Sequence, residues 1–408
     1  MDLNPTPQDE SFRLQVRQWL ADNLPKKKLE TIEERKEWHR KLYEAGYLGM
    51  GWPKEYGGQN ARPMEQAIVG AEMARVNAPA AVNGLGIGIV GPTIIHHGTE
   101  AQKQRYIRNI LTAEEIWCQL YSEPNAGSDL AGLRTRAELD GDDYVVNGQK
   151  IWTSGGMNAD WGILLARTDQ EAPKHQGISC FLLDMHAPGV EVRPIKQISG
   201  SSEFCEVFFT NVRVPAENLV GELNRGWQIA QTTLSYERGG NTLSRVSRQT
   251  AQFDRLLEVA KTLKRNGRPA IEDPIIRQQL GQMYAEIEVL RYATLRLLSR
   301  LEKGLRPGPD SSISKLYYSE LDKRLQEMTQ AILGPYGQLT EGLSPDLSLD
   351  GGEGEGDGGT WAHSFVWSRA GTIYAGSNEI QKNIIGERVL GLPKEVRADR
   401  IALKAGAR

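Results

Sequence analysis

The sequence has no long hydrophobic run, few cysteines and almost no excess of charge of either sign. None of its apolar stretches approaches the roughly 18 to 20 residues that a membrane-spanning helix needs. The start of the chain, MDLNPTPQDESF, has neither the apolar segment of a signal peptide nor the arginines of a transit peptide. Lysine and arginine total 49 against 52 aspartates and glutamates, so no basic field favours nucleic acid or anionic lipid as a partner. We therefore expect a soluble protein without a membrane span.

The cysteines and histidines give no metal or disulfide pattern. Cys118, Cys180 and Cys205 are odd in number and widely spaced, which argues against a disulfide framework and against a zinc site. His96 and His97 are adjacent, so on a helix they would point about 100° apart, and no HExxH motif accompanies them. We expect no metal, and a reducing compartment, the cytoplasm, fits the thiols.

The chain is long enough for two or three domains, and its patterning changes twice. Residues 1–117 mostly show helical spacing, residues 118–225 show short β-rich runs split by turn dipeptides, and residues 226–408 return to helical spacing. The predicted long helices are Trp227–Lys264, Ile275–Lys303 and Ser311–Leu333. This predicts an α+β fold with an N-terminal helical domain, a middle barrel-like β-domain and a C-terminal helical bundle. Residues 350–359, DGGEGEGDGG, are predicted to be a mobile surface insertion.

One glycine motif matches a nucleotide-binding pattern in letters only. Gly86 to Gly91 reads GIGIVG, which fits GxGxxG. The dinucleotide fingerprint also needs a preceding strand and a following helix. Here the residues before it read as helix and Pro92 follows at once. We therefore favour close helix packing through small residues.

The segment Tyr121–Asp129, YSEPNAGSD, is a candidate ligand loop between the helical and β-rich parts. The hydroxyls of Ser122 and Ser128, with the backbone donors around Gly127, suit an anionic or carbonyl-rich group. Taken alone, an ordinary connecting loop explains these residues equally well.

The segment Lys150–Gly155, KIWTSG, follows about 25 residues later. Trp152 offers a broad aromatic face, and Thr153 and Ser154 offer two hydroxyls beside a glycine turn. Such a group suits stacking on a flat heterocycle and hydrogen bonding to its edge. The alternative is a core tryptophan at the end of a strand.

A carboxylate stands on the apolar stripe of the predicted helix that begins near Trp227. Ala230 and Leu234 share a face with that residue, and Glu237 falls on the same stripe, directly before Arg238. Partial burial would raise the pKa of Glu237 toward the range useful for a general base. The alternative is a surface charge pair between Glu237 and Arg238 on a bent helix.

The last candidate segment is Ala370–Gln381, AGTIYAGSNEIQ, a small-residue turn before a predicted helix Ile380–Val389. Ser377 and Asn378 are good N-caps, and a helix start of this kind suits a phosphate or a heterocycle edge. A plain helix cap is the alternative.

These four segments, in this order and in an α–β–α chain of this length, resemble the acyl-CoA dehydrogenase family. The resemblance extends from Gly46-Tyr47-Leu48-Gly49 to Gly391-Leu392-Pro393 and includes Gly98–Lys103 and Asn383–Leu390. It implies that FAD lies between the β-domain and the C-terminal helices, with an acyl-CoA thioester against the flavin. The residues implied to bind FAD are Ser122, Gly127, Ser128, Trp152, Thr153, Ser154, Ser377 and Glu379. Ser128 would also lie near the CoA chain.

The resemblance also implies a second half of the FAD site, supplied by a neighbouring subunit. It maps to Gln330, Gly334 and Gly337, so a homodimer or homotetramer is expected. The glutamine stands one place early relative to the family's glycine pair. The usual Arg-x-x-Phe-Gly reads Leu263-Lys264-Arg265-Asn266-Gly267 in this chain.

The clearest departure from the family is Ala375, where many members carry the catalytic glutamate, because alanine cannot transfer a proton. A subset that includes isovaleryl, long-chain and some bacterial sterol side-chain enzymes places the base on the first helix after the β-domain, where Glu237 stands. The resemblance therefore implies that Glu237 removes the α-proton of the thioester while the β-hydrogen leaves as hydride to the flavin. Arg238, Tyr374 and Ala375 would contact the substrate, and a backbone N–H near Ala375 would polarise its carbonyl.

The expected activity is thus FAD-dependent dehydrogenation of a branched, long or bulky acyl-CoA, with electrons passed to an electron-transferring flavoprotein. Two alternatives remain open. One is a non-catalytic subunit of a heteromeric acyl-CoA dehydrogenase, of which Ala375 would be the sign. The other is a flavin oxidase of the same fold.

Overall fold

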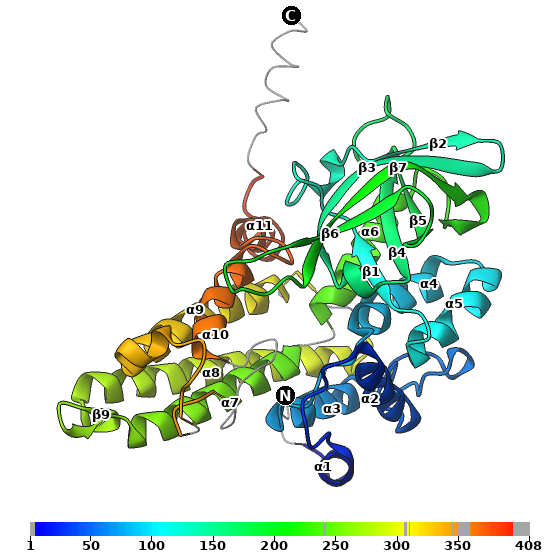
Figure 1. Ribbon diagram of the computed structural model, residues 1–408. Coiled ribbons are helices and arrows are strands. Elements are labelled where there is room, and N and C mark those ends of the chain that lie inside the picture. Colours follow the sequence, from blue (N-terminus) through cyan, green and yellow to red (C-terminus); the bar gives the residue numbers. More distant parts are fainter. Residues whose placement is uncertain are drawn as a thin grey trace, which may run out of the picture.

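The computed structural model describes residues 5–239, 242–305, 308–309, 311–344, 346–349 and 360–394. Figure 1 shows a strand-rich part that sits on the N-terminal helices, while the long C-terminal helices extend to the other side. Helix α6 lies at the junction of these parts. The predicted insertion 350–359 and the side chains of Glu237 and Arg238 lie outside what the structure describes.

The N-terminal part is helical. Its helices are α1 (Pro7–Asn23), α2 (Ile32–Glu44), α3 (Pro63–Arg75), α4 (Gly91–His97) and α5 (Glu100–Thr112). Three of them start at threonine capping boxes, in which a threonine hydroxyl accepts from the backbone three residues on and the side chain there bonds back. The apolar faces of α1, α2 and α3 meet around residues such as Leu20, Trp38 and Val69.

The strand-rich part is one eight-stranded sheet. Its strands are β1 (Trp117–Leu120), β2 (Arg136–Asp140), β3 (Asp143–Ser154), β4 (Trp161–Arg167), β5 (Ile178–Asp184), β6 (Val190–Ile195), β7 (Phe204–Pro215) and β8 (Leu219–Val220). The order is β6-β7-β3-β2-β4-β5-β8, with β1 added in parallel to β4. The pairing of β3 with β7 shifts register between Lys150 and Thr153, so the strand is irregular where the candidate segment Lys150–Gly155 lies.

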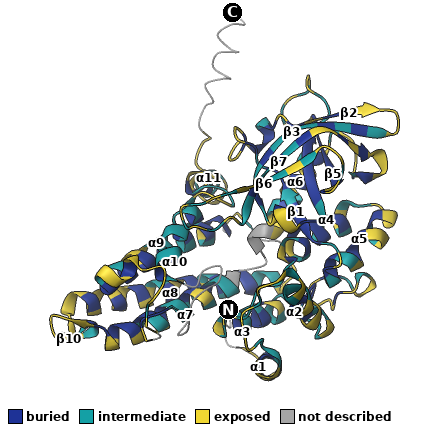
Figure 2. Ribbon diagram, in the orientation of Figure 1, coloured by how far each residue is buried: buried dark blue, intermediate teal, exposed yellow. Residues whose placement is uncertain are grey.

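The C-terminal part is again helical. It comprises α6 (Gly226–Gly239), α7 (Thr242–Thr262), α8 (Pro274–Leu301), α9 (Ser311–Leu333), α10 (Trp361–Ser368) and α11 (Asn378–Ile384), with a short hairpin of β9 (Lys264–Arg265) and β10 (Arg268–Pro269). Figure 2 shows that α7, α8 and α9 bury the sides that face one another, and their core includes Leu256, Leu290 and Leu325.

One predicted helix needs correction, and another is described only in part. Within the stretch Trp227–Lys264 the structure describes α6 (Gly226–Gly239) and α7 (Thr242–Thr262), and residues 240–241 between them lie outside the described part of the chain. The predicted helix Ile380–Val389 starts two residues earlier, at Asn378, and its last turn, Ile385–Val389, is π-helical.

The GxGxxG segment is a helical turn and not a nucleotide loop. Gly86–Val90 forms a π-helical turn that runs directly into α4, and no strand precedes it. A Cβ at Gly91 would overlap the ring of Trp52, and a Cβ at Gly86 would overlap the side chain of Asn83. Close packing through small residues is confirmed at these two glycines. At Gly88 a Cβ would meet nothing within 4 Å.

Among the described residues, no helix is long and apolar enough to cross a membrane. Cys118, Cys180 and Cys205 are all buried and unpaired.

Candidate functional site

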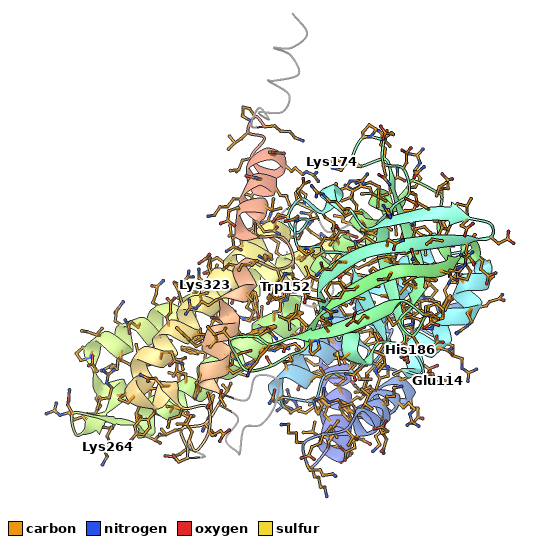
Figure 3. All side chains as sticks on the ribbon, turned by 45° about the horizontal axis from the view of Figure 1, so that its top comes forward. Glu114, Trp152, Lys174, His186, Lys264 and Lys323 are labelled. Carbon is orange, nitrogen blue, oxygen red and sulfur yellow. The ribbon has the colours of Figure 1, made fainter. Side chains whose placement is uncertain are left out.

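The two candidate segments of the strand-rich part are joined by the backbone. The N–H of Ile151 donates to the carbonyl of Ser122 at 2.9 Å. Directly after it, Trp152 has a φ of +60° and is 56% exposed. Left-handed backbone at a bulky residue is strained, at a cost of order 1–3 kcal/mol, and such residues cluster at functional sites. Figure 3 shows Trp152 where the sheet meets the C-terminal helices. The strain therefore presents an aromatic face at the junction of the two parts.

A buried ion pair lies beneath these segments. The ammonium of Lys150 is fully buried and donates to Glu123 Oε1 at 2.9 Å and to the carbonyl of Tyr121 at 3.0 Å. The Glu123 carboxylate also accepts the N–H groups of Arg134 at 2.6 Å and Thr135 at 2.8 Å. Two of the three ammonium hydrogens and both carboxylate oxygens of the pair are thus engaged, as a buried charge pair requires.

The environment shifts both pKa values of this pair. Burial lowers the pKa of Lys150 to about 8, although the Glu123 carboxylate opposes that change. Burial alone would raise the pKa of Glu123, but the Lys150 charge and the hydrogen bonds hold it below its usual value. Both groups are therefore charged at neutral pH, and the pair fixes the loop Tyr121–Asp129 to strand β3.

The other predicted residues of the strand-rich part differ in exposure. Gly127 and Ser128 are exposed, and a Cβ at Gly127 would meet nothing within 4 Å. Ser122 and Ser154 are half-buried. The side chain of Thr153 points inward with 1% exposure, and its hydroxyl has no hydrogen-bond partner in the described part of the chain. The hydroxyls that a surface ligand could reach here are thus those of the three serines.

The turn before α11 is held by one buried amide. Ala375 has a φ of +54°, and Gln381 Nε2 donates to the carbonyls of Ala375 and Gly376 at 3.1 Å each. Ser377 caps the helix by accepting from the N–H of Ile380 at 3.4 Å. The N–H of Ala375 is paired with no acceptor in the described ranges. The turn therefore offers a backbone donor from a rigid, left-handed residue.

A second network fixes the same turn to α9. Asn378 Oδ1 accepts from Lys315 Nζ at 3.1 Å and from Ser319 Oγ at 2.9 Å, and Asn378 Nδ2 donates to Glu320 at 2.7 Å. Asn378 and Lys315 are buried. Glu379, the next residue, is exposed.

Aromatic rings connect the strand-rich part to this turn. The ring of Trp152 meets Phe204 of β7 edge-on at 6.1 Å, and Phe204 stacks on Trp367 of α10 at 5.7 Å with planes 5° apart. Trp367 lies 6.4 Å from the ring of Tyr374. Trp152 and Tyr374, which the sequence places more than 200 residues apart, thus belong to one aromatic cluster.

Helix α6 is hydrogen-bonded to the loop Tyr121–Asp129. Its backbone includes Glu237. One turn earlier, Thr233 is fully buried and its hydroxyl accepts from Tyr121 Oη at 3.0 Å and contacts Thr93 Oγ1 at 3.1 Å. The helix that carries Glu237 is therefore bonded to the loop that carries Ser122.

The second predicted half-site lies elsewhere in this chain. Gln330 is near the end of α9, eleven residues after Ser319, which is about 16 Å along a helix. Gln330 Nε2 donates to the carbonyl of Trp361 at 3.3 Å, and a Cβ at Gly337 would overlap the Gln330 side chain. Gly334 is half-buried and has a φ of +58°. A single chain therefore does not bring this group to the Trp152 region.

The sequence did not identify the buried supports, namely Thr93, Tyr121, Glu123, Lys150, Thr233 and Gln381. One of them carries a visible signal. Tyr144, Val146 and Lys150 occupy alternate positions of one strand, and all three are buried. A lysine on the inward face of a strand requires a buried partner. The other supports are hydroxyls and amides whose partners lie far along the chain.

The described residues include no group of three His, Cys, Asp or Glu placed to hold a metal ion. They do fit a flat organic cofactor. The open face of Trp152, the exposed Ser128 and the space beside Gly127 lie on the strand-rich side, and the Ser377 turn lies beyond the aromatic cluster.

Comparison with known proteins gives the following matches. Three family descriptions match: "Acyl-CoA dehydrogenase, N-terminal domain" over residues 6–114, "middle domain" over 118–212 and "C-terminal domain" over 224–390. The acyl-CoA dehydrogenase IpdE1 of Mycolicibacterium smegmatis is 41% identical over 410 residues, covering 95% of this chain and 99% of that protein. A solved structure described as "Tcur3481-Tcur3483 steroid ACAD" has a TM-score of 0.84 at 32% identity, covering 97% of this chain and 100% of the other. The ChsE4-ChsE5 complex of Mycobacterium tuberculosis has a TM-score of 0.82 at 33% identity, with the same coverage.

Proposed function

The chain belongs to the acyl-CoA dehydrogenase family and is a flavoprotein oxidoreductase, and on this premise we propose that Glu237 is the base of an FAD-dependent dehydrogenation of a bulky acyl-CoA. The observation that supports the proposal is that helix α6 is bonded to the loop beside Trp152. Thr233 and Glu237 stand four residues apart in this helix, so they share a helix face, and Thr233 is bonded to the loop beside Trp152. Ala375, at the position where many members carry the base, has no acidic group.

The residues of this chain would act as follows. Glu237 removes the proton from the carbon α to the thioester carbonyl. This proton is more acidic because the carbonyl oxygen accepts a hydrogen bond from the N–H of Ala375. Trp152, with the hydroxyls of Ser122, Ser128 and Ser154, would hold the cofactor against the strand-rich part. The bound flavin supplies the acceptor for the hydride from the β-carbon.

Two features support a bulky acyl group. Alanine at position 375 leaves the space that a glutamate side chain would fill. The likeness to a protein described as a steroid ACAD points the same way. We infer a branched, long or ring-bearing acyl chain.

A neighbouring copy of the chain completes the cofactor site in this proposal. Gln330, Gly334 and Gly337 lie away from the Trp152 region within one chain, so they would serve the FAD of a partner subunit in a homodimer or homotetramer. Electrons would leave to an electron-transferring flavoprotein. The three buried thiols suit the reducing cytoplasm.

A second candidate is a non-catalytic subunit in a heteromer. It is favoured by Ala375 and by the solved relative that is described as a ChsE4-ChsE5 complex. The presence of a carboxylate at position 237 argues for the catalytic reading, and an oxidase of the same fold is the remaining alternative.

The test is anaerobic bleaching of the flavin in the purified, FAD-loaded protein. The panel consists of butanoyl-CoA, palmitoyl-CoA, isobutanoyl-CoA, cyclohexanecarbonyl-CoA and a steroid side-chain acyl-CoA. We expect rapid bleaching by a branched or ring-bearing thioester and slow bleaching by butanoyl-CoA. Failure of every thioester to bleach the flavin would favour the non-catalytic subunit, and hydrogen peroxide formed in air would favour the oxidase.

A further inference from the structure

Tyr121 makes two buried hydrogen bonds, one through its backbone carbonyl and one through its side-chain hydroxyl. Its carbonyl accepts from Lys150 Nζ at 3.0 Å, and its hydroxyl donates to Thr233 Oγ1 at 3.0 Å. Tyr121 is 5% exposed, and the other two residues are fully buried. One side chain and its own backbone thus connect strand β3 to helix α6.

Both ends of this connection lie close to residues of the proposed reaction. Lys150 precedes Trp152 by two residues, which is about 6–7 Å along a strand. Thr233 precedes Glu237 by four residues, which is about 6 Å along a helix. The distance between the cofactor side and the base side of the site therefore depends on few bonds.

We propose that Tyr121 is a positioning residue that sets the distance between Glu237 and the flavin, through what we call the Tyr121 bridge: Lys150, Tyr121, Thr233 and Thr93. This rests on the proposed function, in which Glu237 is the base. Proton removal and hydride loss occur at adjacent carbons, so both partners must be placed at once. A misplacement of about 1 Å can cost a hundredfold in rate.

The hydrogen-bond count supports a rigid bridge. Thr233 Oγ1 can also donate to the carbonyl of Ile229 at 2.8 Å, and Thr93 Oγ1 to that of Ile89 at 2.8 Å. Three hydroxyl hydrogens thus serve four contacts, of which the fourth is the 3.1 Å approach of the two threonine oxygens. Removing the Tyr121 hydroxyl takes away one of these hydrogens and the hydrogen bond that Thr233 Oγ1 accepts from it in a buried site.

A further contact holds each end of the Tyr121 bridge in place. At one end, Glu123 holds Lys150 in the buried ion pair. At the other, Thr93 belongs to α4, and His97 one turn later bonds Thr232 of α6 at 2.9 Å. Helix α6 is thus bonded both to α4 and to the loop Tyr121–Asp129.

The test uses Tyr121→Phe and Thr233→Val, each of which removes one hydroxyl and little volume. Thr233→Ser keeps the hydroxyl and serves as the rescue variant. Tyr106→Phe is the matched control, because Tyr106 is also 5% exposed and its hydroxyl bonds Asn218 at 3.4 Å, which is not a residue of α6. Each FAD-loaded variant is mixed anaerobically with the thioester that bleaches the wild type fastest, and the limiting reduction rate and the apparent Kd are measured separately.

We expect Tyr121→Phe and Thr233→Val to lower the reduction rate at least tenfold, which is about 1.4 kcal/mol in the barrier, with the Kd changed less than threefold. Thr233→Ser and Tyr106→Phe should stay within threefold of the wild-type rate. Equal rates in Tyr121→Phe and Tyr106→Phe, or an equal loss in Thr233→Ser and Thr233→Val, would overturn the proposal. If Tyr121→Phe does not fold, the two Thr233 variants decide.

A Glu237→Gln variant separates this proposal from the one it rests on. Wild-type reduction in Glu237→Gln would overturn the proposed base, and the bridge with it. Loss of reduction in Glu237→Gln together with an unchanged rate in Tyr121→Phe would overturn the bridge alone.

Discussion

Removal of the Lys150 ammonium should destabilise the protein far more than removal of an exposed lysine. In Lys150→Met the Glu123 carboxylate keeps two backbone donors, Arg134 and Thr135, but loses the buried positive charge at 2.9 Å. Leaving one charge of a buried pair uncompensated costs about 3–5 kcal/mol. An unfolding entropy of about 2.1 cal/mol/K per residue gives a shift of roughly 1 °C per kcal/mol for a chain of this length unfolding as a unit. A loss of about 4–6 °C in Tm follows.

The assay is thermal unfolding of the FAD-loaded protein, with two comparison variants. Lys174→Met removes one half of an exposed pair with Asp129, at 2.8 Å, which should cost less than about 1 kcal/mol. The double variant Glu123→Gln/Lys150→Met removes both charges and should recover most of the lost Tm. Equal Tm values for Lys150→Met and Lys174→Met would refute the reasoning.

The effect of Lys150→Met on stability should also depend on pH. Burial lowers the pKa of Lys150 to about 8 from its ordinary 10.5. Between these values the unfolded chain binds more protons than the folded one, so this group makes stability rise with pH. The stability difference between the wild type and Lys150→Met should therefore grow from about pH 8 to 10.5.

Two further changes test the N-terminal part. Gly91→Ala should cost about 1–3 kcal/mol because its Cβ overlaps the Trp52 ring, whereas Gly88→Ala should leave the Tm unchanged or slightly higher; equal Tm values would contradict the packing argument. Burial would raise the pKa of Glu72, but hydrogen bonds from three arginines lower it to about 2, so its stabilisation of roughly 1–3 kcal/mol is full above pH 4.5 and is lost as the pH falls toward 2. The urea midpoints of the wild type and Glu72→Gln should therefore converge in acid, and a constant difference would contradict this.

Much of the fold could be predicted because its signals are local. The change from helical to strand spacing near residue 118 and back near residue 226 comes from period alone, and helix α9 has the predicted bounds.

The candidate site also contains some residues that local sequence signals identify and others that they do not. Trp152, Ser377 and the Ala375 turn stand in recognisable local segments, although nothing in the sequence shows that Trp152 and Ala375 adopt left-handed backbone. The Tyr121–Thr233 bond joins residues 112 apart and the Thr93–Thr233 contact joins residues 140 apart. Single hydroxyls at such separations give no periodic signal, so only the folded arrangement identifies them.

The central claim is that Glu237 removes the α-proton, and the most direct test is the rate of anaerobic flavin bleaching in Glu237→Gln. Glu222→Gln, an exposed carboxylate that precedes α6 by four residues, is the control at matched FAD content. General-base catalysis typically contributes 10²–10⁴-fold. We therefore predict a rate at least about a hundredfold lower in Glu237→Gln, an unchanged rate in Glu222→Gln and acyl-CoA binding retained in both. Bleaching of Glu237→Gln at the wild-type rate would contradict the account.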